Sequence, residues 1–164
     1  MSTFQPIDSP PEEWESTVYS GIEALLAADD YGISQLANVA SYIMAVMPDL
    51  NWAGFYILRQ GELALGPFQG KPACTRISLN RGVCGEAART LKSMRVGNVD
   101  LFRGHIACDS ASKSELVIPL HQGDLLKGVL DLDSPSLDRF RHEDELFFVK
   151  VGELLSSVVR WGDL

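Results

Sequence analysis

The sequence predicts an α+β fold in which helices pack on one face of a central antiparallel sheet. Three observations predict it. Two segments with helical periodicity open the chain, short aromatic and apolar segments separated by turn residues fill its middle, and one amphipathic segment closes it. A length of 164 residues suits a single domain with a substantial core.

Composition and charge are those of a soluble globular protein. Hydrophobic residues make up 46% and charged residues 22% of the sequence. A net charge of -8 disfavours nucleic acid and anionic lipid as partners, because both bind basic surfaces. No apolar segment is long enough to cross a bilayer, and residues 1–8 lack the basic start and apolar core of a signal peptide. We therefore expect a cytoplasmic protein with no membrane association.

The N-terminal part predicts an arm followed by two helices. Residues 1–10 are expected to form a flexible arm, and residues 11–164 a single domain. The prolines at the end of the arm suit the first turn of a helix over residues 12–28. A second helix continues to Pro48, which ends it. Both carry apolar residues at helical spacing, namely Trp14, Val18, Ile22, Leu25 and Leu26, then Ile33, Leu36, Ala37, Ala40, Ile43, Met44 and Met47.

Strand-type composition begins after the second helix. Residues 51–58 are aromatic and apolar, which is typical of a strand. Gly54 within them indicates a bulge or a close approach of another backbone segment. There follow in order a hairpin partner starting at 63–65, an irregular stretch over 66–72, a short strand over 74–79 and a glycine-rich turn into a short helix over 80–91.

A second hairpin and a closing helix complete the predicted fold. The apolar runs 116–120 and 126–132 flank the turn residues Gln122, Gly123 and Asp124, which predicts a hairpin. A strand over 94–99 and a long loop precede this hairpin, residues 133–136 break its second strand, and residues 143–161 carry the broad apolar stripe of a helix.

The long loop carries a concentration of reactive side chains. His105, Cys108, Asp109 and Glu115 lie within one short passage that leads into a strand. A thiol, an imidazole and carboxylates at such close spacing are suited to thiol chemistry. The alternative for Cys108 is a small buried hydrophobe, which most free cysteines are. His105 is either a base for the thiol or a loop histidine bonded to the backbone.

Three cysteines, at positions 74, 84 and 108, each lie beside a turn or loop. The odd number argues against a structural disulfide framework and favours a reducing compartment. Zinc sites commonly contain a close Cys-x2-4-Cys pair, which these spacings lack, so a zinc site from the cysteines and His105 is disfavoured. No phosphate-binding loop is present either, and we expect neither a metal nor a cofactor. Cys84 is expected near a helix N-terminus, where the backbone dipole favours a thiolate.

Carboxylates supply a second indication of function. Asp131 and Asp133 alternate with apolar residues in one predicted strand, so their side chains point to the same face. Hairpin geometry brings Glu115 near them. Like charges held close together are unfavourable unless they serve a cation, a proton or a ligand. With Trp52 and Tyr56 they form a pocket for a small ligand with an ammonium group; the alternative is a sheet edge protected by charge.

Six blocks of the sequence, in this order, resemble the free methionine-(R)-sulfoxide reductases, which are single GAF-type domains. The resemblance covers roughly residues 12–158. It is carried by NWAGFY at 51–56, GPFQG at 66–70, AC at 73–74, RGVCG at 81–85, GHIACD at 104–109 and GVLDLDS at 128–134. A GAF-like fold and thiol-dependent reduction of the free amino acid are what this resemblance implies.

Residue roles follow from the resemblance. Cys108 corresponds to the attacking cysteine and Cys74 to the resolving one, with Cys84 able to take part in exchange. The resemblance also implies recycling by thioredoxin. Substrate-binding positions correspond to Trp52, Tyr56, Ile106, Glu115, Asp131 and Asp133.

The chemistry of the residues agrees with these roles. Attack on the sulfoxide sulfur requires a proton or strong hydrogen bonds for its oxygen, and a carboxylic acid kept protonated by neighbouring acids supplies them. Sulfenic acid on Cys108 then condenses with a second thiol, Cys74 or Cys84. Acids close to Cys108 disfavour its thiolate, so a compensating donor or proton transfer is required. A GAF-type sensor without chemistry is the alternative function, and the oligomeric state, monomer or homodimer, stays open.

Overall fold

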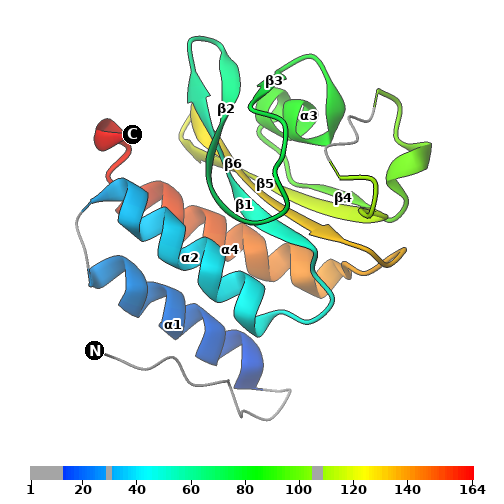
Figure 1. Cartoon of the computed structure of the whole chain (residues 1–164). Helices are drawn as coiled ribbons and strands as arrows, with labels where there is room; N and C mark the ends of the chain where they lie inside the picture. Colours follow the sequence, from blue (N-terminus) through cyan, green and yellow to red (C-terminus); the bar gives the residue numbers. More distant parts are fainter. Residues whose placement is uncertain (1–12, 29–30, 105–108) are drawn as a thin grey trace.

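A computed structural model of the chain describes residues 13–28, 31–104 and 109–164. Its centre is a six-stranded antiparallel sheet with the strand order β3-β2-β1-β6-β5-β4. Figure 1 shows α1, α2 and α4 together on one face of the sheet and α3 on the other. The predicted α+β fold, with the N-terminal and C-terminal helices on one face, is therefore confirmed.

Two helices, α2 (Gly32–Val46) and α4 (His142–Val158), cover the first face of the sheet directly, and α1 (Trp14–Ala27) packs against these two helices. All three lie where helical spacing predicts them. The closing helix is shorter than expected, because Val159 has extended backbone angles, and Trp161 begins the 3-10 turn η3 (Trp161–Asp163). Between these helices and the sheet lies the larger core, which includes the strand residues Ala53, Phe55, Ile57, Leu116, Ile118, Leu120, Leu130 and Leu132.

The first hairpin consists of β1 (Trp52–Arg59) and β2 (Glu62–Gly70). The expectation of an irregular stretch from residue 66 is wrong, since β2 stays paired to β1 as far as Gly70. Tyr56 pairs with Leu65 and Gly54 with Phe68, so β2 holds one extra residue between these pairs. This bulge accommodates the prolyl residue that made the segment look irregular.

The second hairpin, β5 (Ser114–Gln122) and β6 (Leu125–Ser134), forms the other half of the sheet centre. Both strands extend beyond the predicted apolar runs. The central strands β1 and β6 pair along six residues, from Trp52 opposite Asp133 to Ile57 opposite Gly128. Positions at the ends of the apolar runs, such as Asp133, are thereby held in regular strand geometry.

The second face of the sheet carries α3 (Gly82–Thr90) between the edge strands β3 (Arg76–Ser78) and β4 (Met94–Val96). The predicted strand over 94–99 is too long, because Val99 begins the short 3-10 helix η2 (Val99–Leu101). A smaller core lies under α3 and includes Trp52, Tyr56, Leu63, Ile77, Val83, Cys84, Ala87, Ala88, Val117 and Val129.

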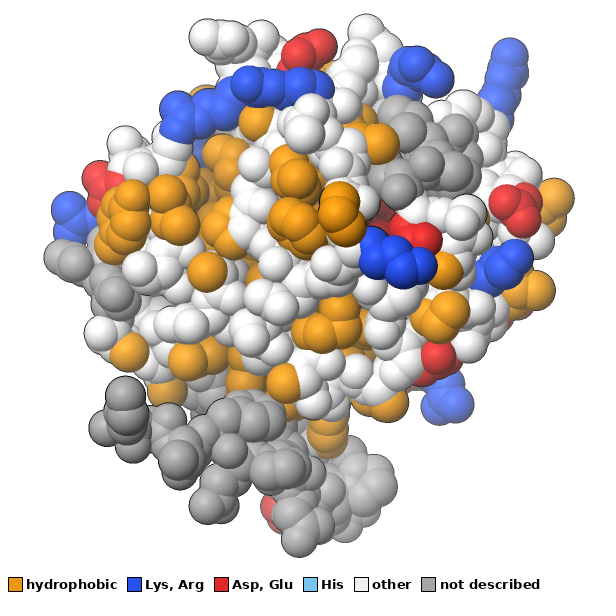
Figure 2. All heavy atoms as spheres, viewed as in Figure 1, with side chains coloured by type: hydrophobic (Ala, Val, Ile, Leu, Met, Phe, Trp, Pro, Cys, Tyr) orange, Lys and Arg blue, Asp and Glu red, His pale blue; other side chains and the backbone are white. Residues whose placement is uncertain are grey.

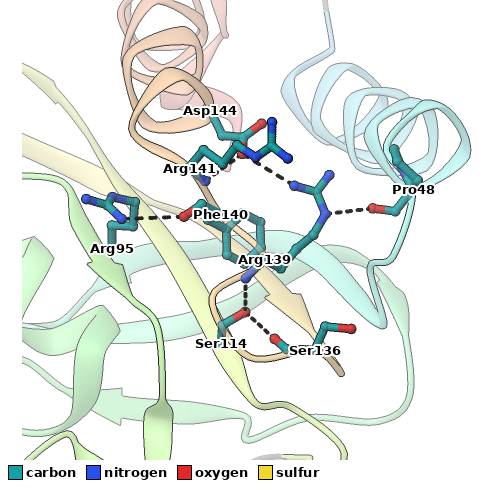
Figure 3. Close-up of polar contacts among 8 residues, drawn as sticks. All are labelled: Pro48, Arg95, Ser114, Ser136, Arg139, Phe140, Arg141 and Asp144. Carbon is teal, nitrogen blue, oxygen red and sulfur yellow. Dashed lines mark hydrogen bonds and ion pairs between the residues drawn. The ribbon is translucent and has the colours of Figure 1, made fainter.

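A polar network fixes the point where β5 begins (Figure 3). The Ser114 hydroxyl donates to the Ser136 carbonyl at 2.7 Å and accepts from the Arg139 backbone N–H at 3.3 Å. The Arg139 guanidinium donates to the Pro48 carbonyl at 3.1 Å and pairs with Asp144 of α4 at 3.3 Å. These contacts join the end of α2, the start of β5 and the start of α4, and they hold the residue after Ser114 in a defined position.

The helices and the molecular surface each add one observation. None of the helices within the described ranges has the length and apolar character needed to cross a bilayer. On the face seen in Figure 2, the acidic side chains of the described residues lie singly among hydrophobic and basic ones and form no continuous patch.

Candidate active site

Strand register brings three carboxyl side chains together on the face of the sheet that α3 covers. Glu115 of β5 pairs directly with Asp133 of β6, and Asp133 pairs on its other side with Trp52 of β1. Asp131 lies two residues before Asp133 and therefore on the same face. The predicted convergence of these acids, hereafter the acidic cluster, is confirmed. The sequence had placed Glu115 just before the strand, whereas in the structure Glu115 lies inside β5.

The thiol of Cys84 faces this cluster from the first turn of α3. Its sulfur lies 3.8 Å from Oε1 of Glu115. Ligand-type atoms of Cys84, Glu115 and Asp131 all lie within 4.8 Å of one another. The three residues are 4%, 6% and 6% exposed, so a thiol and two carboxyl groups share a space from which most water is excluded.

Burial and mutual repulsion favour protonated forms in this space. Burial, followed by the charge of Asp131, raises the pKa of both Glu115 and Asp133 well above the usual range. Burial likewise raises the pKa of Asp131, to about 6, although hydrogen bonds from Cys84 and Glu115 act in the opposite direction. The cluster therefore holds protons near neutral pH that isolated carboxylates would release.

The prediction that the helix dipole favours a thiolate at Cys84 is wrong. Burial, then the charges of Asp131 and Glu115, raise the pKa of the Cys84 thiol well above its usual value. A helix dipole contributes only a few tenths to about 2 kcal/mol at its terminus, which desolvation and nearby carboxylates exceed here. Cys84 is a free, buried thiol.

An aromatic wall, formed by Trp52, Tyr56 and Phe68, borders the acidic cluster. The Trp52 ring stacks on Phe68 with centroids 5.2 Å apart and on Tyr56 with centroids 5.9 Å apart. A Cβ atom at Gly54 would collide with Phe68 and lie 2.7 Å from the Trp52 ring, so the wall requires glycine there. The close approach indicated by Gly54 in the sequence is thus confirmed.

The polar atoms of the aromatic wall hold the segment that contains Cys74. The indole N–H of Trp52 donates to the Lys71 carbonyl at 3.2 Å, and the Tyr56 hydroxyl donates to the Cys74 carbonyl at 3.0 Å. The backbone around Cys74 is therefore fixed against the same wall that borders the acids.

Asn51 and Ser112 complete the polar surroundings, and sequence reasoning missed both. The Asn51 amide donates to Oδ2 of Asp109 at 3.2 Å and to the Ser112 hydroxyl at 3.0 Å. Asp109 also accepts from the Ala111 N–H at 2.9 Å, which is the main cause of its lowered pKa. Asn51 directly precedes Trp52 and Ser112 lies in the same long loop as Asp109, and these positions were the only signals in the sequence.

A pocket connects these groups. It has an empty volume of about 400 Å³, part of it open to solvent. Its apolar lining comes from Ile77 and Val83, and its polar lining includes Tyr56, Cys84, Asp109, Ser112 and the acidic cluster. The pocket therefore has the composition expected for a small, polar, amine-bearing ligand.

The cysteines predicted to react differ in state. Cys74 is disulfide-bonded, whereas Cys84 is a free thiol. His105, Ile106 and Cys108 lie outside the described residues, and the roles predicted for them stay predictions. A zinc site that includes Cys74 as a thiolate is incompatible with its disulfide.

Comparison with known proteins identifies relatives across most of the chain. The GAF domain family model matches residues 22–159. Free methionine-R-sulfoxide reductase of Escherichia coli is 45% identical over 133 residues, 81% of each chain. Protein YtsP of Bacillus subtilis is 43% identical over 140 residues, which cover 84% of this chain and 86% of YtsP.

A solved structure is also similar over nearly the whole chain. A crystal structure of free methionine-R-sulfoxide reductase from Neisseria meningitidis, in complex with its substrate, superimposes with a TM-score of 0.90 at 36% identity. The superposition covers 98% of this chain and 97% of the other.

Proposed function

This chain belongs to the free methionine-R-sulfoxide reductase family of GAF domains, and on that premise we propose that it reduces free methionine-R-sulfoxide to methionine. It is accordingly an oxidoreductase. The single observation that carries the proposal is the buried acidic cluster beside the aromatic wall and the Cys74 segment. A reductase for a small sulfoxide needs all three: proton donors, an apolar surface for the thioether and a second redox-active sulfur.

Substrate recognition divides between charged and apolar parts of the pocket. Asp109, whose pKa the Ala111 hydrogen bond lowers further, is negatively charged at neutral pH and favours an ammonium group at the pocket rim. The flat rings of Trp52 and Tyr56 suit the methyl and methylene groups next to the sulfur. Ile106 is proposed to add a further apolar contact, as the family resemblance implies.

The acidic cluster is proposed to act on the sulfoxide oxygen. A carboxylic acid that retains its proton near pH 7 donates to this oxygen as its bond to sulfur breaks. Burial strengthens such hydrogen bonds because water does not compete for them. A surface carboxyl group has lost its proton at this pH and would therefore be a poorer donor.

The cysteine steps balance as two successive reactions. The Cys108 thiol attacks the sulfoxide sulfur, the sulfoxide oxygen passes from that sulfur to the Cys108 sulfur, and methionine leaves with its sulfur reduced, so that Cys108 becomes a sulfenic acid. The Cys74 thiol then attacks that sulfur, so that water leaves and a disulfide forms. An external dithiol, proposed to be thioredoxin, reduces this disulfide by exchange. The disulfide-bonded state of Cys74, beside a Cys84 that stays free, supports Cys74 as the resolving residue.

Single-turnover reactions of the reduced protein test the proposal. Methionine release, with a loss of two hydrogen atoms from the protein mass, is expected for wild type. Cys108→Ser is expected to form no methionine, whereas Cys74→Ser should complete its first turnover and fail to recycle. A Cys108→Ser variant with the wild-type yield would overturn these roles, and retained ligand with unchanged protein mass would indicate a sensor instead.

A further inference from the structure

We propose that Cys84, Glu115 and Asp131 form a binding site for a divalent cation of the zinc class. The residues come from three elements, α3, β5 and β6, whose packing brings one ligand atom from each into the same space. The proposed reductase chemistry assigns no role to the Cys84 thiol that requires it to lie between two carboxyl groups. A metal ion does give such an arrangement a purpose.

The distances suit tetrahedral coordination. Bond lengths of about 2.3 Å for zinc to sulfur and about 2.1 Å for zinc to oxygen place the two ligands of a tetrahedral site about 3.6 Å apart. Sulfur of Cys84 and Oε1 of Glu115 are 3.8 Å apart, and the whole trio lies within 4.8 Å. Small side-chain rotations therefore suffice, and three protein ligands leave a fourth position open to water.

A second observation, independent of the clustering, also indicates a ligand. Oδ1 of Asp131 is buried and has no hydrogen-bond partner within the described part of the chain. The side chain is 6% exposed and lines the same pocket as Cys84 and Glu115. A buried oxygen without a hydrogen-bond partner is unfavourable, and a cation bound beside it would remove that penalty.

The ligand set selects the type of cation. Calcium takes six to eight oxygen ligands and magnesium strict octahedral oxygen coordination, and neither favours sulfur. One thiol with two carboxylates suits zinc and its spectroscopic substitute cobalt(II). Binding replaces the thiol proton by a metal–sulfur bond and releases that proton to solvent, with no change in oxidation state.

Occupation of this site has a consequence for catalysis that rests on the proposed function. The cation would engage two members of the acidic cluster and fill part of the pocket expected to receive the sulfoxide. Cation and substrate are then mutually exclusive, and zinc acts as a competitive inhibitor.

Direct metal binding to the full-length protein provides the test. The protein is reduced, treated with chelator and dialysed, and then titrated with cobalt(II) and with zinc. We expect one ion per chain, a cobalt–thiolate charge-transfer band and the release of protons on binding. Cys84→Ser should abolish the band, and Asp131→Asn should weaken zinc binding by more than the roughly 10–100-fold that follows loss of a group outside the ligand shell.

Cys74→Ser is the matched control, because it removes a thiol of the same chain that is not part of the trio. It should keep both the band and the zinc affinity. Absence of binding to wild-type protein, or a band that survives Cys84→Ser but disappears in Cys74→Ser, would overturn the proposal. Circular dichroism of each variant separates loss of a ligand from loss of fold.

The outcomes also separate this site from the reductase proposal. Metal binding is measured without substrate, so its failure leaves the proposed reduction unaffected. A normal cobalt band in a protein that does not reduce methionine-R-sulfoxide would instead refute the reductase and retain the cation site. Inhibition that is relieved by raising the sulfoxide concentration is the result expected when both proposals hold.

Discussion

The two faces of the sheet carry different helices, with α1, α2 and α4 on one side and α3 on the other (Figure 1). Alternate residues of the same strands point to these two faces. In β6, Leu130 and Leu132 enter the larger core, whereas Asp131 and Asp133 point to the pocket. In β5, Leu116 follows Glu115 in the same alternation. A shift of one residue along a strand thus separates a side chain that stabilises the fold from one suited to chemistry.

The two faces differ in what burial does to the free energy of folding. Each buried leucine on the first face contributes roughly 1.5–3 kcal/mol by leaving water. On the second face burial raises the pKa of every member of the acidic cluster, which means that their charged forms are disfavoured in the folded state. We therefore expect truncation on the first face to lower the stability of the fold, and neutralisation of an acid on the second face to raise stability while impairing function.

Truncation on the first face should have the largest effect on stability. Leu130 is fully buried, so Leu130→Ala is expected to lower the free energy of unfolding by about 2–5 kcal/mol. The control is Leu125→Ala in the same strand, where the side chain is 59% exposed and a change below about 0.5 kcal/mol is expected. Urea unfolding measures both, and equal losses would remove the distinction between the buried and exposed ends of β6.

Neutralisation on the second face should act in the opposite direction. Asp131→Asn removes a buried carboxylate and one source of repulsion for its neighbours, so we expect the free energy of unfolding at pH 7.5 to rise by roughly 1–3 kcal/mol. The exposed Asp124 in the β5–β6 turn provides the control, and Asp124→Asn should change stability by less than about 0.5 kcal/mol. A lower stability of Asp131→Asn would mean that this carboxylate stabilises the fold.

The pH dependence of stability should carry the same signature. The pKa of Asp131 is about 6 in the folded protein, above its usual 3.8, so the folded state binds this proton more tightly than the unfolded state. The proton on Asp131 therefore adds to the free energy of unfolding. This stabilisation is complete below about pH 4, is lost as the pH rises to about 6 and does not change further above it. Thermal unfolding between pH 4 and pH 7, with chelator present, should show this fall in wild type and a weaker one in Asp131→Asn.

The junction between the two faces should give the smallest effect. Ser114→Ala removes a hydroxyl that donates to the Ser136 carbonyl and accepts from the Arg139 N–H (Figure 3). We expect a loss of about 1–2 kcal/mol, because two part-buried backbone groups lose their partner. Ser136→Ala is the control, since the carbonyl and not the hydroxyl of Ser136 takes part. Indistinguishable urea midpoints would show that the network does not stabilise the start of β5.

Local patterns in the sequence predicted most of the fold. Helical spacing located α1, α2 and α4, and the apolar runs around the Gly123 turn located the central hairpin. Period-two alternation was enough to place Asp131 and Asp133 on one face, and hairpin pairing brought in Glu115. The strand β2 was underestimated because its bulge depends on pairing with β1, which residues 66–70 alone do not reveal.

The site was harder to predict where it depends on contacts between distant segments. The high pKa of the Cys84 thiol arises from strands that lie far along the sequence, so the local argument from the helix dipole failed. The bridge from Asn51 to Asp109 and Ser112 likewise joins residues that are close only in the fold. The roles of His105, Ile106 and Cys108 stay predictions, because these residues lie outside those that the structure describes.

We propose that the acidic cluster serves chemistry and does not stabilise the fold. The most direct test is Glu115→Gln, which keeps the shape of the side chain and removes the acidic carboxyl proton. The variant is measured for single-turnover methionine formation and for melting temperature at pH 7.5. We predict a rate lower by about 10²–10⁴-fold, as for loss of a general acid, at an unchanged or higher melting temperature. A wild-type rate, or a slow variant that also melts well below wild type, would contradict the claim.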